Sequence, residues 1–299
     1  MIRAIQAPFG KGAPVGGVSE GQGGSRFRRG GCHRTRVSTV TEGLHNCSRQ
    51  RRETESELYS FHTNDPFYTR ILSLYESYGG GYDFVGFWVQ ETESKLTSAI
   101  SRFEDKFSLY LTDDSDLEEI SSFLRFQGAG AVICARGFAL DIKADRVIEG
   151  QVLRYIGEHY NSEIELYSPE IKPFYELLQS CASDIFIVPE YMTFLSDVTH
   201  RRNLGKCTIL GTDIDGTLVS GLMTVSETSS AVILGAVATH PDFRRRGLSR
   251  ELVRTLASQI IARGREAYVF SASEANTRFY QNSGFTICAE FAEILGSLW

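Results

Sequence analysis

A short basic turn contains the residues of this sequence that are best suited to chemistry. Residues 231–238 form a continuous apolar run, and residues 244–247 (Arg-Arg-Arg-Gly) precede a segment of helical periodicity. The order is therefore strand, glycine-containing basic turn and helix. The first amides of a helix lack internal acceptors, and the helix dipole makes that end electropositive. Because arginines add charge-assisted hydrogen bonds, the turn is predicted to bind a pyrophosphate.

Three elements must position this turn. We expect a strand over residues 231–239, a helix over 247–263 with one apolar face, and a second strand over 267–271. Gly264 is expected to terminate the helix. A strand–helix–strand crossover makes its two strands parallel and right-handed.

Two motifs in this region resemble those of the GNAT superfamily of N-acetyltransferases. RRRGLS at 244–249 is similar to the family signature Q/R-x-x-G-x-G/A, with Ser249 where the family has Gly or Ala. ANTRFYQNSGF at 275–285 is similar to the family's short helix that ends in F/L-Y-x-x-x-G-F. The resemblance implies an α+β fold, a GNAT-like mixed sheet flanked by helices. It places the GNAT N-acetyltransferase domain over residues 164–299.

The resemblance also implies a cofactor and a set of site residues. Acetyl-CoA would be the co-substrate, without a metal, and its pantetheine arm would enter a gap between the two splayed strands. Tyr280 would act as the general acid that protonates the coenzyme A thiolate. Ser273 stands at the family's cofactor-binding Asn position, so the nearby Asn276 is assigned instead. The implied cofactor-binding residues are Val237, Ala238, Thr239, Arg244, Arg245, Arg246, Gly247, Leu248, Ser249 and Asn276.

The implied reaction is direct attack of a neutral amine on the thioester. A backbone amide of strand 231–239 would stabilise the oxyanion. Glu227 and His240 are candidate bases because they are near this strand in sequence, and a chain of water molecules is an equal alternative. The acceptor would be a small-molecule or peptide amine.

Two helices, predicted at 171–181 and from Pro189 to about 203, are implied by the resemblance to lie beside the acceptor. Glu190, Tyr191 and Asp197 are candidates to face a cationic amine. For each one, a solvated polar helix face is the alternative.

Residues 57–163 are predicted to be a degenerate, non-catalytic GNAT-like domain in tandem with the first. The patterns indicate a helix after Asp65-Pro66, strands at 84–89, 96–103, 106–111 and 131–135, and a helix from about 117. An unrelated α+β domain is the alternative. Residues 147–156 fit either a strand or a helix.

Residues 1–56 are predicted to be a disordered Gly/Arg-rich tail, because they have few large apolar residues and no periodicity. Residues 1–52 hold ten Lys/Arg and two acidic residues, which leaves 21 basic and 35 acidic residues in 53–299. An over-long gene model with its true start near Leu58, an inert tail, an RNA-binding arm and a transit peptide all remain open.

Composition limits the other classes of function. No apolar run approaches the roughly 20 residues of a membrane span. The six cysteines form no C-x-x-C pair, which indicates a reducing cytoplasm and no metal site. The acidic body makes nucleic acid an unexpected partner. The oligomeric state is not predicted.

Two alternatives to an acetyltransferase remain. The first is an acetyl-CoA-binding sensor or structural protein without turnover. The second is a HAD-type phosphatase, because TILGTDIDGTL at 208–218 matches the D-x-D-G-T nucleophile motif through Asp213 and Asp215. However, the last lysine is Lys206, and no adjacent acidic pair follows Asp215. Asp215-Gly216 is therefore predicted to be a hairpin turn between strands 208–214 and 217–225.

Overall fold

The computed structural model describes residues 1–4, 57–93, 95–183 and 186–296. Eleven strands of this part form one sheet in the order β1-β2-β3-β4-β5-β11-β6-β10-β9-β8-β7. The helices are α2 (Pro66–Tyr78), α3 (Leu117–Phe126), α4 (Ile171–Ser180), α5 (Tyr191–Asn203), α6 (Leu248–Ala262) and α7 (Glu274–Asn282). The strands are β1 (Ile2–Ala4), β2 (Val85–Thr92), β3 (Lys95–Phe103), β4 (Lys106–Leu111), β5 (Ala131–Ala135), β6 (Arg146–Tyr155), β7 (Ile209–Ile214), β8 (Thr217–Glu227), β9 (Ala231–Thr239), β10 (Glu266–Ser271) and β11 (Phe285–Leu295). This architecture confirms the predicted α+β class.

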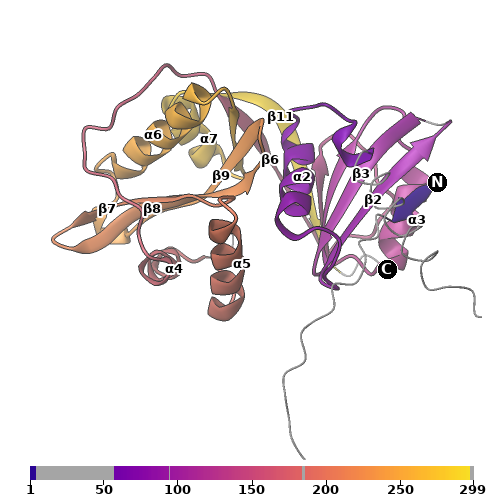
Figure 1. The fold of residues 1–299 in the computed structure, drawn as a ribbon, viewed down its shortest axis with the longest axis horizontal. Coiled ribbons are helices and arrows are strands. Elements are labelled where there is room, and N and C mark those ends of the chain that lie inside the picture. Colours follow the sequence, from indigo (N-terminus) through magenta and orange to yellow (C-terminus); the bar gives the residue numbers. More distant parts are fainter. Residues whose placement is uncertain (5–56, 94, 184–185, 297–299) are drawn as a thin grey trace, which may run out of the picture.

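Helices cover both faces of the sheet. In Figure 1, α6 and α7 lie on one side of β8 and β9, and α4 and α5 lie on the other. Helix α2 lies between the two halves of the molecule and contacts β4, β8 and β9. It starts where predicted because the Asp65 carboxylate caps it, accepting from the Phe67 amide at 2.8 Å.

The first half repeats the order of the second. Antiparallel β2, β3 and β4 are followed by α3 and then by β5, which pairs in parallel with β4. The segment 147–156, which fitted either element in the sequence, is a strand up to Tyr155, as part of β6. Both halves therefore contain the antiparallel strands, the helix and the parallel partner that the tandem prediction requires.

The halves exchange strands at the middle of the sheet. β6 follows the first half in sequence but pairs with β10 of the second half. β11, the last strand of the chain, pairs with β5 of the first half and with β6. A domain boundary at residue 163 would therefore separate β6 from both of its neighbours in the sheet, β10 and β11. In Figure 1, β11 runs from the second half into the first.

The prediction of a disordered tail over 1–56 is wrong for residues 2–4. These residues form β1, which pairs antiparallel with β2 through Ile2 and Gln90. Ile2 packs against the apolar cluster beneath α3, and its amide donates to Glu119 at 2.9 Å. β1 thus pairs with backbone groups of β2 that would otherwise lie unpaired at the edge of the sheet. Residues 5–56, with the rest of that prediction, lie outside the described residues.

Two helix starts differ from the prediction. Pro189 precedes the cap of α5 instead of lying in its first turn, because the Glu190 side chain caps the helix by accepting from the Thr193 amide. Gly247 is the N-cap of α6 and not its first helical residue. Among the described helices, none is long and apolar enough to cross a membrane.

Candidate active site

The pairing of β9 and β10 ends before β9 does, and we call the unpaired stretch between the two strands the gap. The two strands are paired in parallel only from Ala231–Glu266 to Leu234–Val269. Beyond Leu234, β9 contains a bulge against β8, and Ala236 within it has a φ of +50°. A non-glycine residue in this conformation is uncommon and costs energy, which surrounding structure must offset. The extra residue of the bulge is unpaired in the β8 ladder, and β10 does not pair with this part of β9.

Hydroxyl groups tie the end of β9 to the start of α6. Ser220 on β8 and Thr239 on β9 are hydrogen-bonded through their hydroxyls at 2.7 Å, and Ser220 also donates to the Ala238 carbonyl at 3.0 Å. The Thr239 hydroxyl is in turn hydrogen-bonded to that of Ser249 in the first turn of α6. Ser249, which departs from the Gly or Ala of the family signature, thus gains a positioning contact.

The turn before α6 presents unused amide donors. Arg245 and Gly247 have φ values of +65° and +83°, in the left-handed region. No side chain caps α6. Within the described part of the chain, the amides of residues 245–249 donate to no protein acceptor. An anion is therefore the group that this turn fits.

The three arginines of the turn have different environments. Arg244 donates from Nε to the Thr239 carbonyl at 3.2 Å, and Arg246 lies over the Phe243 ring at 4.9 Å. All three side chains are exposed. Arg244 therefore fixes the turn to β9, while Arg245 and Arg246 leave donors available to a phosphate.

Tyr280 is buried on α7, in the same apolar cluster as Val237 and Leu252. Its ring contacts Phe279 and Phe285, with centroid separations of 5.1 and 5.8 Å. Burial raises the pKa of Tyr280 to about 12. The phenol is consequently protonated near neutral pH, as a proton donor must be.

Two of the acceptor-side candidates, Asp197 and Glu190, have partners of their own. Asp197 forms an ion pair with Arg201 at 2.6 Å and accepts from the Tyr78 hydroxyl at 2.6 Å. Glu190 is used in capping α5, and the amides it accepts from lower its pKa. The interpretation of Asp197 as an amine-facing group is therefore unsupported by its contacts. Helix α4 does approach the site, because Cys181 after it donates to the Thr239 carbonyl at 3.3 Å.

Neither candidate base is well placed. Glu227 is buried at the opposite end of β9, where it pairs with Arg265 at 2.8 Å and faces Val232 across the ladder. His240 is adjacent to the site in sequence, but its Nδ1 accepts from the Asp242 amide at 3.4 Å to cap a short 3₁₀ helix (Pro241–Phe243). The Glu227 carboxylate is thus paired away from the end of β9.

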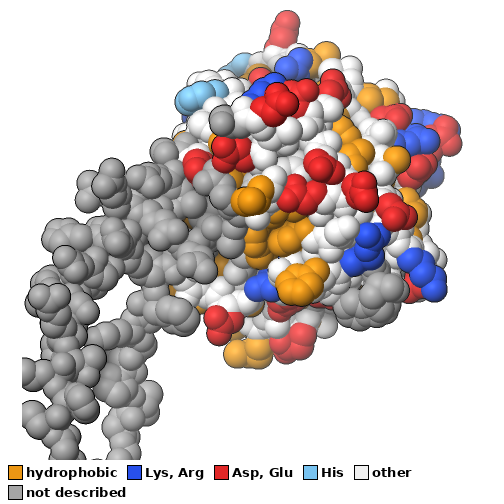
Figure 2. All heavy atoms as spheres, turned by 90° about the vertical axis from the view of Figure 1, so that its right-hand side faces the viewer, with side chains coloured by type: hydrophobic (Ala, Val, Ile, Leu, Met, Phe, Trp, Pro, Cys, Tyr) orange, Lys and Arg blue, Asp and Glu red, His pale blue; other side chains and the backbone are white. Residues whose placement is uncertain are grey.

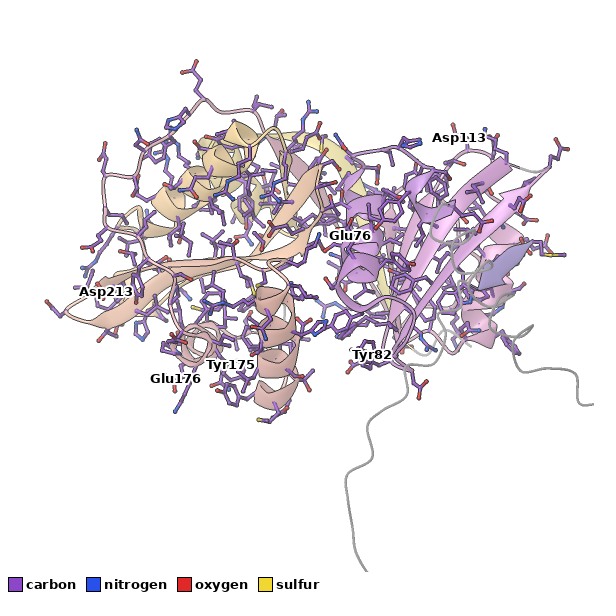
Figure 3. The ribbon with its side chains drawn as sticks, viewed as in Figure 1. Glu76, Tyr82, Asp113, Tyr175, Glu176 and Asp213 are labelled. Carbon is purple, nitrogen blue, oxygen red and sulfur yellow. The ribbon has the colours of Figure 1, made fainter. Side chains whose placement is uncertain are left out.

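Two further sequence candidates are separate from these groups. Asn276 is exposed in the first turn of α7, and its side chain forms no hydrogen bond to another candidate in the described ranges. Asp215 and Gly216 form the predicted turn, with φ values of +52° and +75°. Asp213 lies beside this turn, near the tip of the β7–β8 hairpin (Figure 3).

Comparison with known proteins agrees with this geometry. Residues 215–292 match the family model described as FR47-like protein. A GCN5-related N-acetyltransferase from Sphaerobacter thermophilus superposes with a TM-score of 0.53 at 13% identity, over 76% of this chain and 84% of that chain. A tandem GNAT protein from the clavulanic acid biosynthesis pathway gives 0.50 at 11%, over 79% and 90%. No curated protein sequence matches.

The chain has the GNAT fold. The two superpositions, at 11% and 13% identity, show the fold, the family model covers residues 215–292, and the tandem neighbour agrees with the arrangement of two halves. The matched residues 215–292 include the cofactor-binding candidates and Tyr280, but not the acceptor-side candidates Glu190, Tyr191 and Asp197.

Three contributors to the GNAT site were missed in the sequence. Ala236 gave no signal, because alanine does not favour a positive φ. Ser220 and Cys181 belong to elements whose pairing with β9 depends on register and packing. One indication of the hydroxyl contacts was present in the sequence: Ser249 stands at the sixth signature position, where the family has Gly or Ala, and its hydroxyl bonds to that of Thr239.

Proposed function

We propose that the protein is an N-acetyltransferase that transfers the acetyl group of acetyl-CoA to an amine. One observation carries the proposal: the β9–β10 gap opens beside the unused amides of residues 245–249 and close to the cluster that contains Tyr280. The fold and the family match support acetyltransferase activity in general.

The residues at the gap fit the parts of acetyl-CoA. The amides of 245–249 would hold its diphosphate, with Arg245 and Arg246 adding charge. Backbone groups of Val237, Ala238 and Thr239 would pair with the pantetheine amides, as an added strand does. Acetyl-CoA supplies an activated thioester, so the protein need only orient it and stabilise developing charge.

The proton transfers follow from the same placement. The amine nitrogen bonds to the thioester carbon, an amide of the β9 bulge stabilises the oxyanion, and the carbon–sulfur bond then breaks. Tyr280 donates its proton to the leaving thiolate, and water reprotonates the phenolate. Water also accepts the proton of the amine, because Glu227 is occupied by Arg265.

The first half does not offer an equivalent phosphate site. Helix α3 corresponds to α6, but Asp116 caps it by accepting from the Glu119 amide at 3.0 Å, and Glu118 lies in its first turn. Negative charge and an occupied amide oppose an anion there. We therefore assign the first half a non-catalytic role.

Release of free thiol from acetyl-CoA in the presence of an amine panel tests the proposal. Tyr280→Phe should lower kcat about 100-fold and leave the Kd for coenzyme A unchanged, because a general acid contributes roughly 10²–10⁴. Tyr155→Phe is the matched control, since it removes a buried hydroxyl from the same cluster, one that donates to the Glu158 carbonyl. Coenzyme A binding without thiol release for any amine would instead establish a sensor.

A further inference from the structure

A cavity of about 250 Å³, lined by charged, hydroxyl and apolar side chains, lies between the two halves of the molecule. Helix α2 and strands β3 and β4 line it from the first half, and α5 and β8 line it from the second. Figure 3 shows Glu76, which is on α2, at this junction, where it pairs with Lys206 at 2.5 Å. The volume is near the lower end of the roughly 300–1,000 Å³ typical of ligand pockets, so an occupant must be small.

Positive charge dominates the lining. Arg70, Lys106 and Arg201 line the cavity, against the single carboxylate of Asp197. Arg201 is neutralised by Asp197, which it contacts at 2.6 Å. Arg70 and Lys106 form no ion pair within the described residues, so two cations face the cavity without a counter-charge in contact.

Arg70 is the most informative of these groups. Its Nε donates to the Ser108 hydroxyl at 3.4 Å, and its guanidinium lies over the Phe270 ring at 5.5 Å. Burial lowers the pKa of Arg70, and Glu293 on β11 opposes this effect from beyond ion-pair distance. A guanidinium remains charged in proteins, and a desolvated charge is costly unless it is paired. The remaining donors of Arg70 therefore suit an anion.

Hydroxyl groups complete the lining. Ser101 and Ser226 are 2% and 7% exposed, and their side chains form no hydrogen bond to a described residue. Both line the cavity together with Ser108. Hydroxyl donors beside two cations are the chemistry that binds oxyanions.

We infer that this cavity binds a small oxyanion, a phosphate or a carboxylate, held by Arg70, Lys106 and the serine hydroxyls. The site is distinct from the acetyl-CoA gap. Ser226 is six residues along β8 from Ser220, which contacts the gap, so the two sites are roughly 20 Å apart. Because both halves line the cavity, an occupant would also stabilise their packing.

Calorimetric titration of the full chain with inorganic phosphate, and separately with succinate, tests the inference. Saturating coenzyme A is present to block the turn at 245–249, and chloride is kept low. We expect at least one anion to bind and to protect the peptides of α2 and α5 from hydrogen exchange. Arg70→Gln and Lys106→Gln should each weaken binding about 10- to 100-fold, as expected for loss of a charge-assisted hydrogen bond.

Matched variants separate this site from others. Arg263→Gln changes the same charge at an exposed position and should leave the affinity unchanged. Arg245→Gln should also leave it unchanged, since that arginine belongs to the turn at the acetyl-CoA gap. Lys106 is exposed, so Lys106→Gln remains informative even if Arg70→Gln does not fold. Binding of neither anion, or equal affinity in folded Arg70→Gln and Lys106→Gln, would overturn the inference, whether or not acetyl transfer is observed.

Discussion

Removal of the Asp197 carboxylate should destabilise the protein without impairing acetyl transfer. Arg201 is 9% exposed and donates to both oxygens of Asp197, from Nε at 3.0 and 3.1 Å and from one terminal nitrogen at 2.6 Å. The Tyr78 hydroxyl on α2 donates to the same carboxylate, so the group joins the two halves. Burial raises the pKa of Tyr78, and the hydrogen bond to Asp197 raises it further, so the phenol stays a donor at neutral pH.

The magnitude follows from what the substitution leaves behind. In Asp197→Ala, Arg201 becomes a buried cation with only the carbonyls of Thr224 and Val225, at 3.4 and 3.3 Å, as acceptors. Breaking a buried pair in this way costs about 3–5 kcal/mol. A loss of that size lowers Tm by about 10 °C in a domain of this size. Tyr78→Phe removes one hydrogen bond to a charged group, worth about 1.5–3 kcal/mol, and provides the graded comparison.

Urea denaturation measures the free energy of unfolding, and thiol release measures kcat and KM for the amine. We expect a lower urea midpoint for Asp197→Ala, with KM within about twofold of wild type. An unchanged midpoint with a tenfold higher KM for the amine would refute the structural role and restore Asp197 to the acceptor site. A control is Glu176→Ala, which removes an exposed carboxylate from α4 and should change neither quantity (Figure 3).

Three further predictions concern the candidate site. A phenol donates a proton only below its pKa, and the pKa of Tyr280 is raised to about 12. We therefore expect ionisation of Tyr280 to cause no decline in kcat up to about pH 10, where an unperturbed tyrosine would be half ionised. A profile of kcat against pH measures this. Gly247→Ala should lower the free energy of unfolding by about 1 kcal/mol, because alanine is strained at a φ of +83° although no atom lies within 4 Å of the added Cβ. Urea denaturation measures this loss, and titration with coenzyme A measures any change in affinity. Glu227→Gln should lower stability by about 3 kcal/mol by leaving Arg265 unpaired, while kcat changes little; a large fall in kcat at unchanged stability would identify Glu227 as the base.

The outer face of the first half is chemically mixed. Figure 2 shows acidic and basic side chains interspersed there, with hydrophobic side chains among them. On the part of this face that is described, basic residues thus do not form one continuous surface. The expectation that nucleic acid is not a partner stays a prediction, which a titration with labelled RNA would test directly.

Local patterns in the sequence predicted most of the elements. The apolar run of β9, the one-sided periodicity of α6 and the capping residues Asp65 and Asp116 act within a few residues, so they are visible in one dimension. The Asp215-Gly216 hairpin belongs to the same class, because its positive φ values suit these residue types. The basic turn and the tyrosine motif are likewise contiguous, so the sequence alone places the candidate site on the β9–α6–β10 crossover and α7.

The tertiary structure decided how distant segments meet. The exchange of β6 and β11 depends on which strands compete for the edges of β5 and β10, and no local pattern encodes that choice. Asp197 and Glu227 look like free acidic groups in the sequence, but folding pairs them with Arg201 and Arg265. The sequence by itself therefore determined the elements and the motif that links them. The packing of the two halves determined which charges are paired and which, like that of Arg70, face a cavity. Burial and ion-pair partners depend on segments that are distant in the sequence, so no local pattern contains them.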